Sequence, residues 1–422
     1  MKSQLALLLV PVMALAAGAS AFGADAVSKE EYQKLQKEHE QLKKEMKELL
    51  EWKNQVQTKG AAAGTATALS GEEKAAPGGV SLGSTKLLVT GYGAAGFTER
   101  RHGDDGFTAQ FNPIFLWKLS DRLFFEGEIE LELEESATAT KLELASLYYV
   151  ATDHLTLGAG KFLNPMNSFV ERFHMAWVNR LPDKPLAVYD GLLPETYVGA
   201  QARGGVPLGS TKLNYSLFIG NAPQLKRSGE DLSEAGTFEF DNFDNAGSHY
   251  AFGGRLGFLP IPELEFGYGI HYSRVDDGVD AWLQSVDVNY VRDSEALRGM
   301  VRVNAQWVWS QVGRVTYDEG DFGGTPGNTF TFSNRRNGGY AQIAYRPTKV
   351  ASTIVQKLEP VFRYDLLEQK KTPVGYDESR YTIGLNYWLG PSTVLKTAYQ
   401  FDDRSHGSQN QNAILIQAAM GF

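Results

Sequence analysis

Apolar and polar residues alternate with a period of two through most of the chain after residue 84. The clearest example is RLFFEGEIELELEE, residues 122–135, in which Phe125, Ile129 and Leu131 share one face of an extended strand. The other face carries the carboxylates of Glu126, Glu128, Glu130, Glu132 and Glu134. A soluble sheet does not bury such a row of carboxylates, whereas a strand lining a water-filled barrel exposes them to solvent. The pattern therefore predicts a strand of a transmembrane β-barrel.

The same alternation recurs in about 16 segments. Their predicted ranges are 86–97, 108–119, 122–134, 140–151, 154–162, 196–206, 211–220, 249–259, 263–274, 280–292, 297–311, 337–346, 357–367, 379–389, 393–403 and 412–422. Every second connection is mostly a tight turn, and the others are longer, notably 163–195, 221–248 and 312–336. Short periplasmic turns and long external loops are typical of bacterial barrels.

We therefore expect an all-β, antiparallel transmembrane barrel of about 16 strands over residues 85–422, with both of its ends on the periplasmic side. The connection 346–357 is long for a periplasmic turn and has room for an extra hairpin. A barrel of 18 strands is therefore an open alternative.

The first segment contains the pattern G-x-G-x-x-G at Gly91, Gly93 and Gly96. In a dinucleotide-binding fold this pattern opens a helix, and a carboxylate follows about 20 residues later. Here a polar, turn-rich stretch follows, and the next strand, FNPIFLWK at 111–118, holds no carboxylate. We therefore assign the glycines to a tilted strand that bends where the barrel closes, and we expect no nucleotide cofactor.

The N-terminal part of the chain divides into three segments without strand alternation. Residues 1–21 have a lysine, an apolar run and small residues before the predicted cleavage site, which is typical of a secretory signal peptide. Residues 28–57 carry a heptad repeat that predicts an α-helical coiled coil, with a single solvated amphipathic helix as the alternative. The heptad core includes Leu35, Leu42, Leu49 and Val56. Residues 58–84, rich in Ala, Gly, Ser and Thr, predict a flexible linker.

Composition narrows the function. The 422 residues include 44 glycines and 12 % aromatic residues, and their mean hydropathy of -0.30 suits a barrel better than a large soluble core. The chain has no cysteine, so it forms no disulfide and attaches no c-type haem, and we expect neither a cofactor nor a metal site. A net charge of -9 argues against nucleic acid as a partner.

The C-terminal segment NAILIQAAMGF alternates apolar residues and ends on the aromatic Phe422. It resembles the terminal strand of Gram-negative outer-membrane proteins, which the barrel assembly machinery recognises. Together with the signal peptide, the coiled coil and the number of segments, this makes the chain resemble an outer-membrane porin, and it is distantly similar to the phosphate-selective porins. The stretch most similar to that family is residues 157–186. The resemblance implies a homotrimer of 16-stranded barrels in outer-membrane lipid, with the coiled coil in the periplasm.

The third external loop, 163–195, is long and poor in strand alternation. Ser168 and Glu171 predict a capping box that opens a helix, and the apolar spacing extends this helix to Trp177. In porins this loop folds into the barrel and narrows it. By this resemblance the loop residues that meet the lumen are Glu171, Arg172, His174 and Arg180. The alternative is a loop folded over the rim of the barrel.

The face of each strand opposite its apolar residues is expected to line the lumen. Its acidic candidates are Glu126, Glu128, Glu130 and Glu132. Its basic candidates are Arg203, Arg255, Arg298, Arg302, Arg363 and Arg380. We expect two opposed charged walls, although each residue has the alternative role of neutralising a charge on a neighbouring strand. Because the signs are mixed, we favour a general or weakly selective channel for ions and small hydrophilic solutes over strong phosphate selectivity.

Three other classes of protein are weighed against a channel. An enzyme is not expected, because the seven histidines are scattered and no G-x-S-x-G motif accompanies them. A barrel that sheathes a partner, such as a multihaem cytochrome in an electron conduit, would conduct no ions when its lumen is filled. A structural anchor would grip peptidoglycan or another envelope component through the coiled coil, and its loss would weaken the envelope without changing permeability.

Overall fold

The computed structural model describes residues 80–82, 85–103, 105–134, 137–188, 192–230, 232–239, 249–369, 377–405 and 409–422. The predicted signal peptide, the predicted coiled coil with its core leucines, and most of the predicted linker lie outside these ranges. Three residues near the C-terminal end of the predicted linker are described. Val80–Leu82 form a short strand, β1, that pairs antiparallel with the start of β2.

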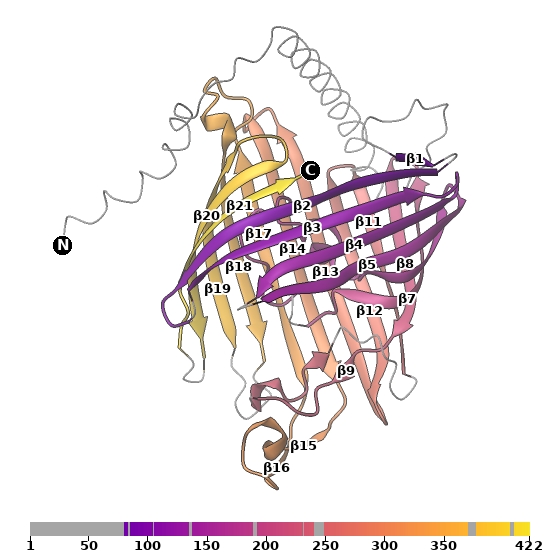
Figure 1. Cartoon of the computed structure of the whole chain (residues 1–422), viewed down its shortest axis with the longest axis vertical. Coiled ribbons are helices and arrows are strands. Elements are labelled where there is room, and N and C mark those ends of the chain that lie inside the picture. The colour runs from indigo at the N-terminus through magenta and orange to yellow at the C-terminus, as the bar shows by residue number, and fades with distance from the viewer. Residues whose placement is uncertain are drawn as a thin grey trace, which may run out of the picture. The chain divides into compact units, whose positions relative to one another are not determined.

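Within the described ranges, sixteen antiparallel strands form one closed barrel (Figure 1). They are β2 (Thr85–Arg100), β3 (Gly106–Lys118), β4 (Leu123–Glu134), β5 (Ala137–Thr152), β6 (Leu155–Leu163), β7 (Thr196–Leu208), β8 (Thr211–Asn221), β11 (Tyr250–Ile261), β12 (Leu264–Asp276), β13 (Val279–Ser294), β14 (Gly299–Val312), β17 (Arg335–Arg346), β18 (Leu358–Glu368), β19 (Glu378–Trp388), β20 (Thr393–Arg404) and β21 (Ala413–Gly421). Each strand pairs with the barrel strand next in the chain.

The barrel closes between its first and last strands, because β2 pairs with β21 over Tyr92 to Arg100. The chain end completes this seam. The Gly91 amide donates to the Phe422 carbonyl at 3.1 Å, and the Phe422 amide donates back to the Gly91 carbonyl at 3.0 Å. The connection 346–357 contains a 3-10 helix, η4 (Val355–Lys357), and no hairpin, so the 18-stranded alternative is wrong.

The two faces of the sheet are inverted relative to a soluble protein. On β12, Phe266 and Tyr268 are 47 % and 45 % exposed, whereas Glu265 and His271 on the opposite face of the strand are 6 % and 0 % exposed. On β21 the outward residues are Ile414, Ile416, Ala418, Met420 and Phe422, as the alternation predicts. An apolar outer surface and a polar inner surface are what a barrel in lipid needs.

Smaller elements gather at the end of the barrel away from the C-terminus (Figure 1). They are β9 (Gln224–Leu225), η1 (Leu232–Glu234), β10 (Phe238–Glu239), β15 (Thr316–Asp318), η3 (Glu319–Phe322) and β16 (Thr329–Thr331). These elements belong to two connections, one between β8 and β11 and the other between β14 and β17. Leu225 of the first connection is buried in one apolar cluster with Tyr317 and Phe322 of the second. No helix in the described part of the chain is long and apolar enough to cross a membrane.

The close approach at the seam gives a test of the fold. A Cβ atom at Gly91 would lie 2.2 Å from the Asn112 carbonyl oxygen and 2.9 Å from the Phe422 ring, with φ at +157°. We expect Gly91→Ala to lower the free energy of unfolding by about 1–3 kcal/mol, because this space is already filled. The measurement is a urea titration of the refolded barrel followed by tryptophan fluorescence.

Gly93→Ala is the matched control, because a Cβ there meets its nearest atom at an ordinary 3.4 Å. We expect the free energy of unfolding of that variant to stay within about 0.5 kcal/mol of the parent protein's value. Equal effects of the two substitutions would show that the seam is not tightly packed at Gly91.

Candidate functional site

The connection between β6 and β7 contains a segment that contacts inward-facing side chains of many barrel strands. We call residues 164–188 the inner loop. Its base is fixed by Asn164, whose backbone amide donates to the Glu195 carbonyl at 2.8 Å and whose side-chain amide donates to the Pro194 carbonyl at 2.8 Å. Its two arms are joined where the Asn167 side-chain amide donates to the Val188 carbonyl at 2.5 Å.

The helix of the inner loop is shorter than the sequence predicts. It is α2 (Ser168–Phe173), and its N-cap is Asn167, whose side chain accepts from the Val170 amide at 3.2 Å. The predicted capping box of Ser168 and Glu171 is therefore wrong, because the residue before Ser168 caps the helix. The predicted extension to Trp177 is also wrong. The helix ends at Phe173, and its C-cap His174 bonds the Val170 carbonyl through a ring nitrogen.

One side of the inner loop is apolar and packs on the wall formed by β13, β14 and β17. Met166, Phe169 and Val170 are almost fully buried in this cluster. The rings of Phe169 and Tyr340 meet edge to face with centroids 5.8 Å apart. The Gln306 side chain donates to the Met166 carbonyl at 2.8 Å. Apolar packing and buried hydrogen bonds therefore hold the loop against these strands.

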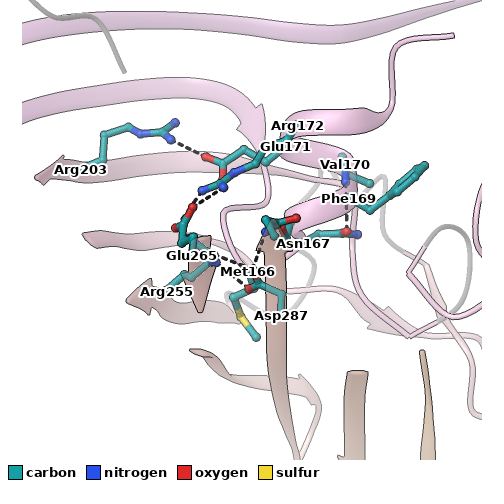
Figure 2. A network of polar contacts seen from close by, with 12 residues as sticks. Met166, Asn167, Phe169, Val170, Glu171, Arg172, Arg203, Arg255, Glu265 and Asp287 are labelled. Atoms are coloured by element: carbon teal, nitrogen blue, oxygen red, sulfur yellow. Dashed lines mark hydrogen bonds and ion pairs between the residues drawn. The ribbon is translucent and has the colours of Figure 1, made fainter. Parts of the chain in front are cut away.

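The charged side of α2 forms ion pairs with β7 and β12, and Glu265 on β12 extends the network to β11 and β13, as Figure 2 shows. Arg172 forms a two-pronged ion pair with Glu265. Arg255 donates to Glu265 at 2.9 Å and to Asp287 at 2.7 Å. Glu171 accepts from Arg203. Six charged groups, two on α2 and one on each of four strands, thus form one continuous network.

The inner loop reaches β4 through His174. The ring Nε2 of this histidine lies 3.9 Å from the Glu128 carboxylate, and its ring meets Tyr92 edge to face. On the neighbouring strand, the Asn112 side-chain amide lies 3.4 Å from Glu128 and 3.5 Å from Glu130. The carboxylates of β4 thus lie beside the loop.

The returning arm of the inner loop follows β17 to β21. Asp183 accepts from Arg363 at 2.5 Å and from Gln400 at 2.5 Å, and it lies 3.6 Å from Arg380. Lys396 donates to the Leu181 carbonyl at 3.3 Å, to Gln417 at 2.8 Å, and also to the Ala176 carbonyl. The loop therefore contacts inward side chains on both sides of the barrel.

The structure brings most of the predicted lumen residues into contact with the inner loop. The strand residues with a direct polar contact to it are Glu128, Arg203, Arg363 and Arg380, and these contacts or the ones to Glu265 and Glu359 also involve the loop's own Glu171, Arg172 and Arg180. Arg302 joins through Glu359, which Arg180 also approaches. Arg255 joins through Glu265. Glu126, Glu130 and Glu132 are half-buried on β4.

Arg298 does not belong to this set. It lies exposed in the turn between β13 and β14, at φ 52°, and its guanidinium donates to the Lys349 carbonyl at 3.2 Å. The prediction placed it one residue inside the strand, but β14 begins at Gly299. Sequence reasoning also missed Asn167 and Asp183, because neither residue stands in an alternating segment or a recognised motif.

For several of the predicted lumen arginines the structure shows the alternative role, neutralisation of nearby carboxylates. The arginines of β11, β18 and β19 are paired with carboxylates on the same or the next strands. Arg363 donates to Asp365 at 2.7 Å, and Arg380 donates to Glu378 at 2.6 Å. The reason is that attraction to a neighbouring carboxylate offsets the hydration energy that a buried arginine loses, whereas an unpaired arginine has no such compensation.

No protein-family model matches this chain, and no curated protein matches it in sequence. Solved structures do match its fold. OmpF of Salmonella typhi, in complex with daunomycin, has a TM-score of 0.54 at 10 % identity, over 82 % of this chain and 100 % of that chain. In-vitro folded OmpT, an outer membrane protein of Vibrio cholerae, has a TM-score of 0.50 at 11 % identity, over 85 % of this chain and 100 % of that chain. The chain therefore has the fold of the outer-membrane porins, a closed 16-stranded antiparallel barrel.

The contacts of Asp183 lead to a prediction about stability. Arg363 is fully buried, and Asp183→Ala would remove one of its two carboxylate partners. We expect the free energy of unfolding to fall by about 3–5 kcal/mol, because an ionised group would remain buried with incomplete pairing. The measurement is a urea titration of the refolded barrel. Asp121→Ala is the control, because that carboxylate pairs with Lys118 while 94 % exposed, and we expect a change below about 1 kcal/mol.

The contact between His174 and Glu128 predicts a pH dependence. Burial lowers the pKa of His174, but the facing carboxylate raises it more, so the net direction is upward. Because the folded pKa lies above the ordinary value of about 6.5, protonated His174 stabilises the protein fully below that pH. The contribution is lost as the pH rises through the folded pKa. We expect the thermal midpoint of the parent protein to fall across this window, and that of His174→Gln to stay flat.

His102→Gln is the control for this experiment, because His102 lies exposed in the turn between β2 and β3. The thermal midpoint of this variant should show the same pH dependence as that of the parent protein. If His174→Gln also keeps it, the titrating group is a different one.

Proposed function

We propose that this protein is an outer-membrane channel for the passive diffusion of ions and small hydrophilic solutes. The observation that carries this proposal is the inversion of the barrel's faces, with apolar residues outside and a charged interior. A continuous apolar belt suits lipid, and a charged interior suits hydrated solutes. The fold that the chain shares with outer-membrane porins supports the same function at a general level.

We further propose that the inner loop narrows the channel. Its contacts support this, because His174 faces β4 while Asp183 faces β18 and β19. A solute that moves along the barrel axis would pass beside the loop. The constriction would then be lined by loop and wall charges of both signs. These are Glu126, Glu128, Glu130, Glu132, Glu171, Arg172, Arg180, Arg203, Arg255, Arg302, Arg363 and Arg380.

The orientation in the membrane is part of the proposal. The tight turns and the C-terminus would face the periplasm, and the loops with β9 and β15 would face outward. Phe422 would serve as the signal that the barrel assembly machinery reads. Its ring is 47 % exposed and stacks on Phe111, with centroids 5.5 Å apart, which keeps the aromatic side chain at the outer surface of the seam.

Two further proposals rest on the sequence. The heptads over residues 28–57 would form a periplasmic coiled coil that holds three barrels together or reaches peptidoglycan or another envelope component. The signal peptide would direct the chain out of the cytoplasm. We favour a channel over a sheath for a multihaem partner, because the inner loop already fills part of the space such a partner would need. We also favour it over an enzyme and over a purely structural anchor.

Single-channel recording in planar bilayers tests the channel. We expect the refolded protein to produce conductance steps in groups of three, with mild ion selectivity. Replacing residues 166–188 with a short Gly-Ser linker should raise the conductance of each step, because the narrowing segment is gone. Removing residues 316–331, which include β15 and β16, is the control and should leave the conductance unchanged.

The outcomes separate the alternatives. Folded barrels that give no steps would overturn the channel and favour a sheath or an anchor. Steps whose size does not change when the inner loop is replaced would overturn the constriction while leaving the channel in place.

A further inference from the structure

One cluster of arginines lies at the end of the barrel where the tight turns are. Arg302 stands near the start of β14, and the loop residue Arg180 reaches toward it. Both approach one carboxylate, that of Glu359 near the start of β18. The Nε atom of Arg180 lies 3.5 Å from Glu359 Oε1, and the Nε atom of Arg302 lies 3.8 Å from the same oxygen.

A third arginine joins the cluster through an aromatic ring. The guanidinium carbons of Arg180 and Arg346 lie 4.9 Å and 5.1 Å from the ring centroid of Trp388. The indole Nε1 of Trp388 donates to Glu359 Oε2 at 2.8 Å. The tryptophan thus forms an aromatic surface on which two guanidinium groups stack.

The charge balance of this cluster differs from that of the other two inside the barrel. In the network at α2, the three arginines 172, 203 and 255 meet the three carboxylates 171, 265 and 287. At β18 to β20, the three arginines 363, 380 and 404 meet the four carboxylates 183, 365, 378 and 402. In the third cluster, Arg180 and Arg302 share a single carboxylate, that of Glu359.

Hydrogen bonding shows the same deficit of acceptors. The Nε atoms of Arg180 and Arg302 are buried and have no hydrogen-bond partner among the described residues. Glu359 Oε2 is already used by Trp388 and by the Asn386 side chain, at 3.3 Å. Burial lowers the pKa of Arg180, Glu359 opposes this shift, and the charge of Arg346 adds to it. A buried donor without an acceptor is costly, so this site favours an added anion.

We propose that Arg180, Arg302 and Arg346 form a binding site for a small solute that carries an oxyanion, either a phosphate or a carboxylate. The planar guanidinium groups match the spacing of two oxygens on such a group, and the buried Trp388 ring holds two of them in place. Arg302 keeps 27 % of its side chain exposed, which leaves a route from the lumen. This proposal rests on the proposed function, because it names the class of solute that enters the channel.

The first experiment measures binding without relying on conductance. Inorganic phosphate and, separately, succinate are titrated into the refolded protein in detergent and followed by calorimetry. We expect the double variant Arg302→Gln, Arg346→Gln to bind about tenfold or more weakly, which corresponds to roughly 1.4 kcal/mol or more. Arg292→Gln is the matched control, because that arginine is exposed near the end of β13, and it should bind as the parent protein does.

Two more variants guard against a simple failure to fold. Arg302→Lys keeps the charge but loses the two-pronged donor, and its affinity should lie between those of the parent and the double variant. Glu359→Gln removes the competing carboxylate, so it should bind the anion more tightly than the parent. An Arg302, Arg346 double variant that binds like the parent, or a Glu359→Gln variant that binds more weakly, would overturn the site.

The same anions are then added to open channels in bilayers. Block by phosphate alone identifies a phosphate site, and block by succinate alone identifies a carboxylate site. Channels that conduct but show neither binding nor block would overturn this inference and leave the proposed function standing. Anion binding by barrels that never conduct would support the site and overturn the channel.

Discussion

The constraint on which the rest of the molecule depends is that backbone hydrogen bonds have no water to replace them in lipid. A sheet in that environment has to close on itself, and here closure is made by β2 and β21 with the terminal residue Phe422 bonded to Gly91. Closure gives every strand an outer and an inner face. The outer face has to be apolar, so the polar side chains that a chain of this composition carries are directed inward.

Charges directed inward create a second requirement, because each of them loses hydration where the interior is filled. The inner loop meets this need on both sides of the barrel. Its Arg172 supplies a cation to Glu265, and its Asp183 supplies an anion to Arg363. Its backbone carbonyls accept from Lys396. The loop and the strand charges therefore depend on each other, because each supplies the other's counter-charges.

Sequence reasoning predicted the barrel well, because the alternation that defines each strand is local and repeats about 16 times. It failed where adjacent residues compete for one role. Asn167 rather than Ser168 caps α2, and Arg298 falls in a turn one residue before its strand. The ion pairs were beyond its reach, since Arg363 and Asp183 are 180 residues apart and only the fold brings them together. The sharing of the Glu359 carboxylate by Arg180 and Arg302 depends on the same long-range packing.

The reach of the inner loop also orders the events of assembly. The loop leaves the barrel after β6, but its carbonyls at Leu181 and Pro182 accept from Lys396 on β20 and Gln417 on β21, more than 200 residues later. These contacts form only after the final strands arrive. A chain that ended before β20 would lack both the strands that close the wall and the last partners of the inner loop, so the same C-terminal residues complete the wall and the interior.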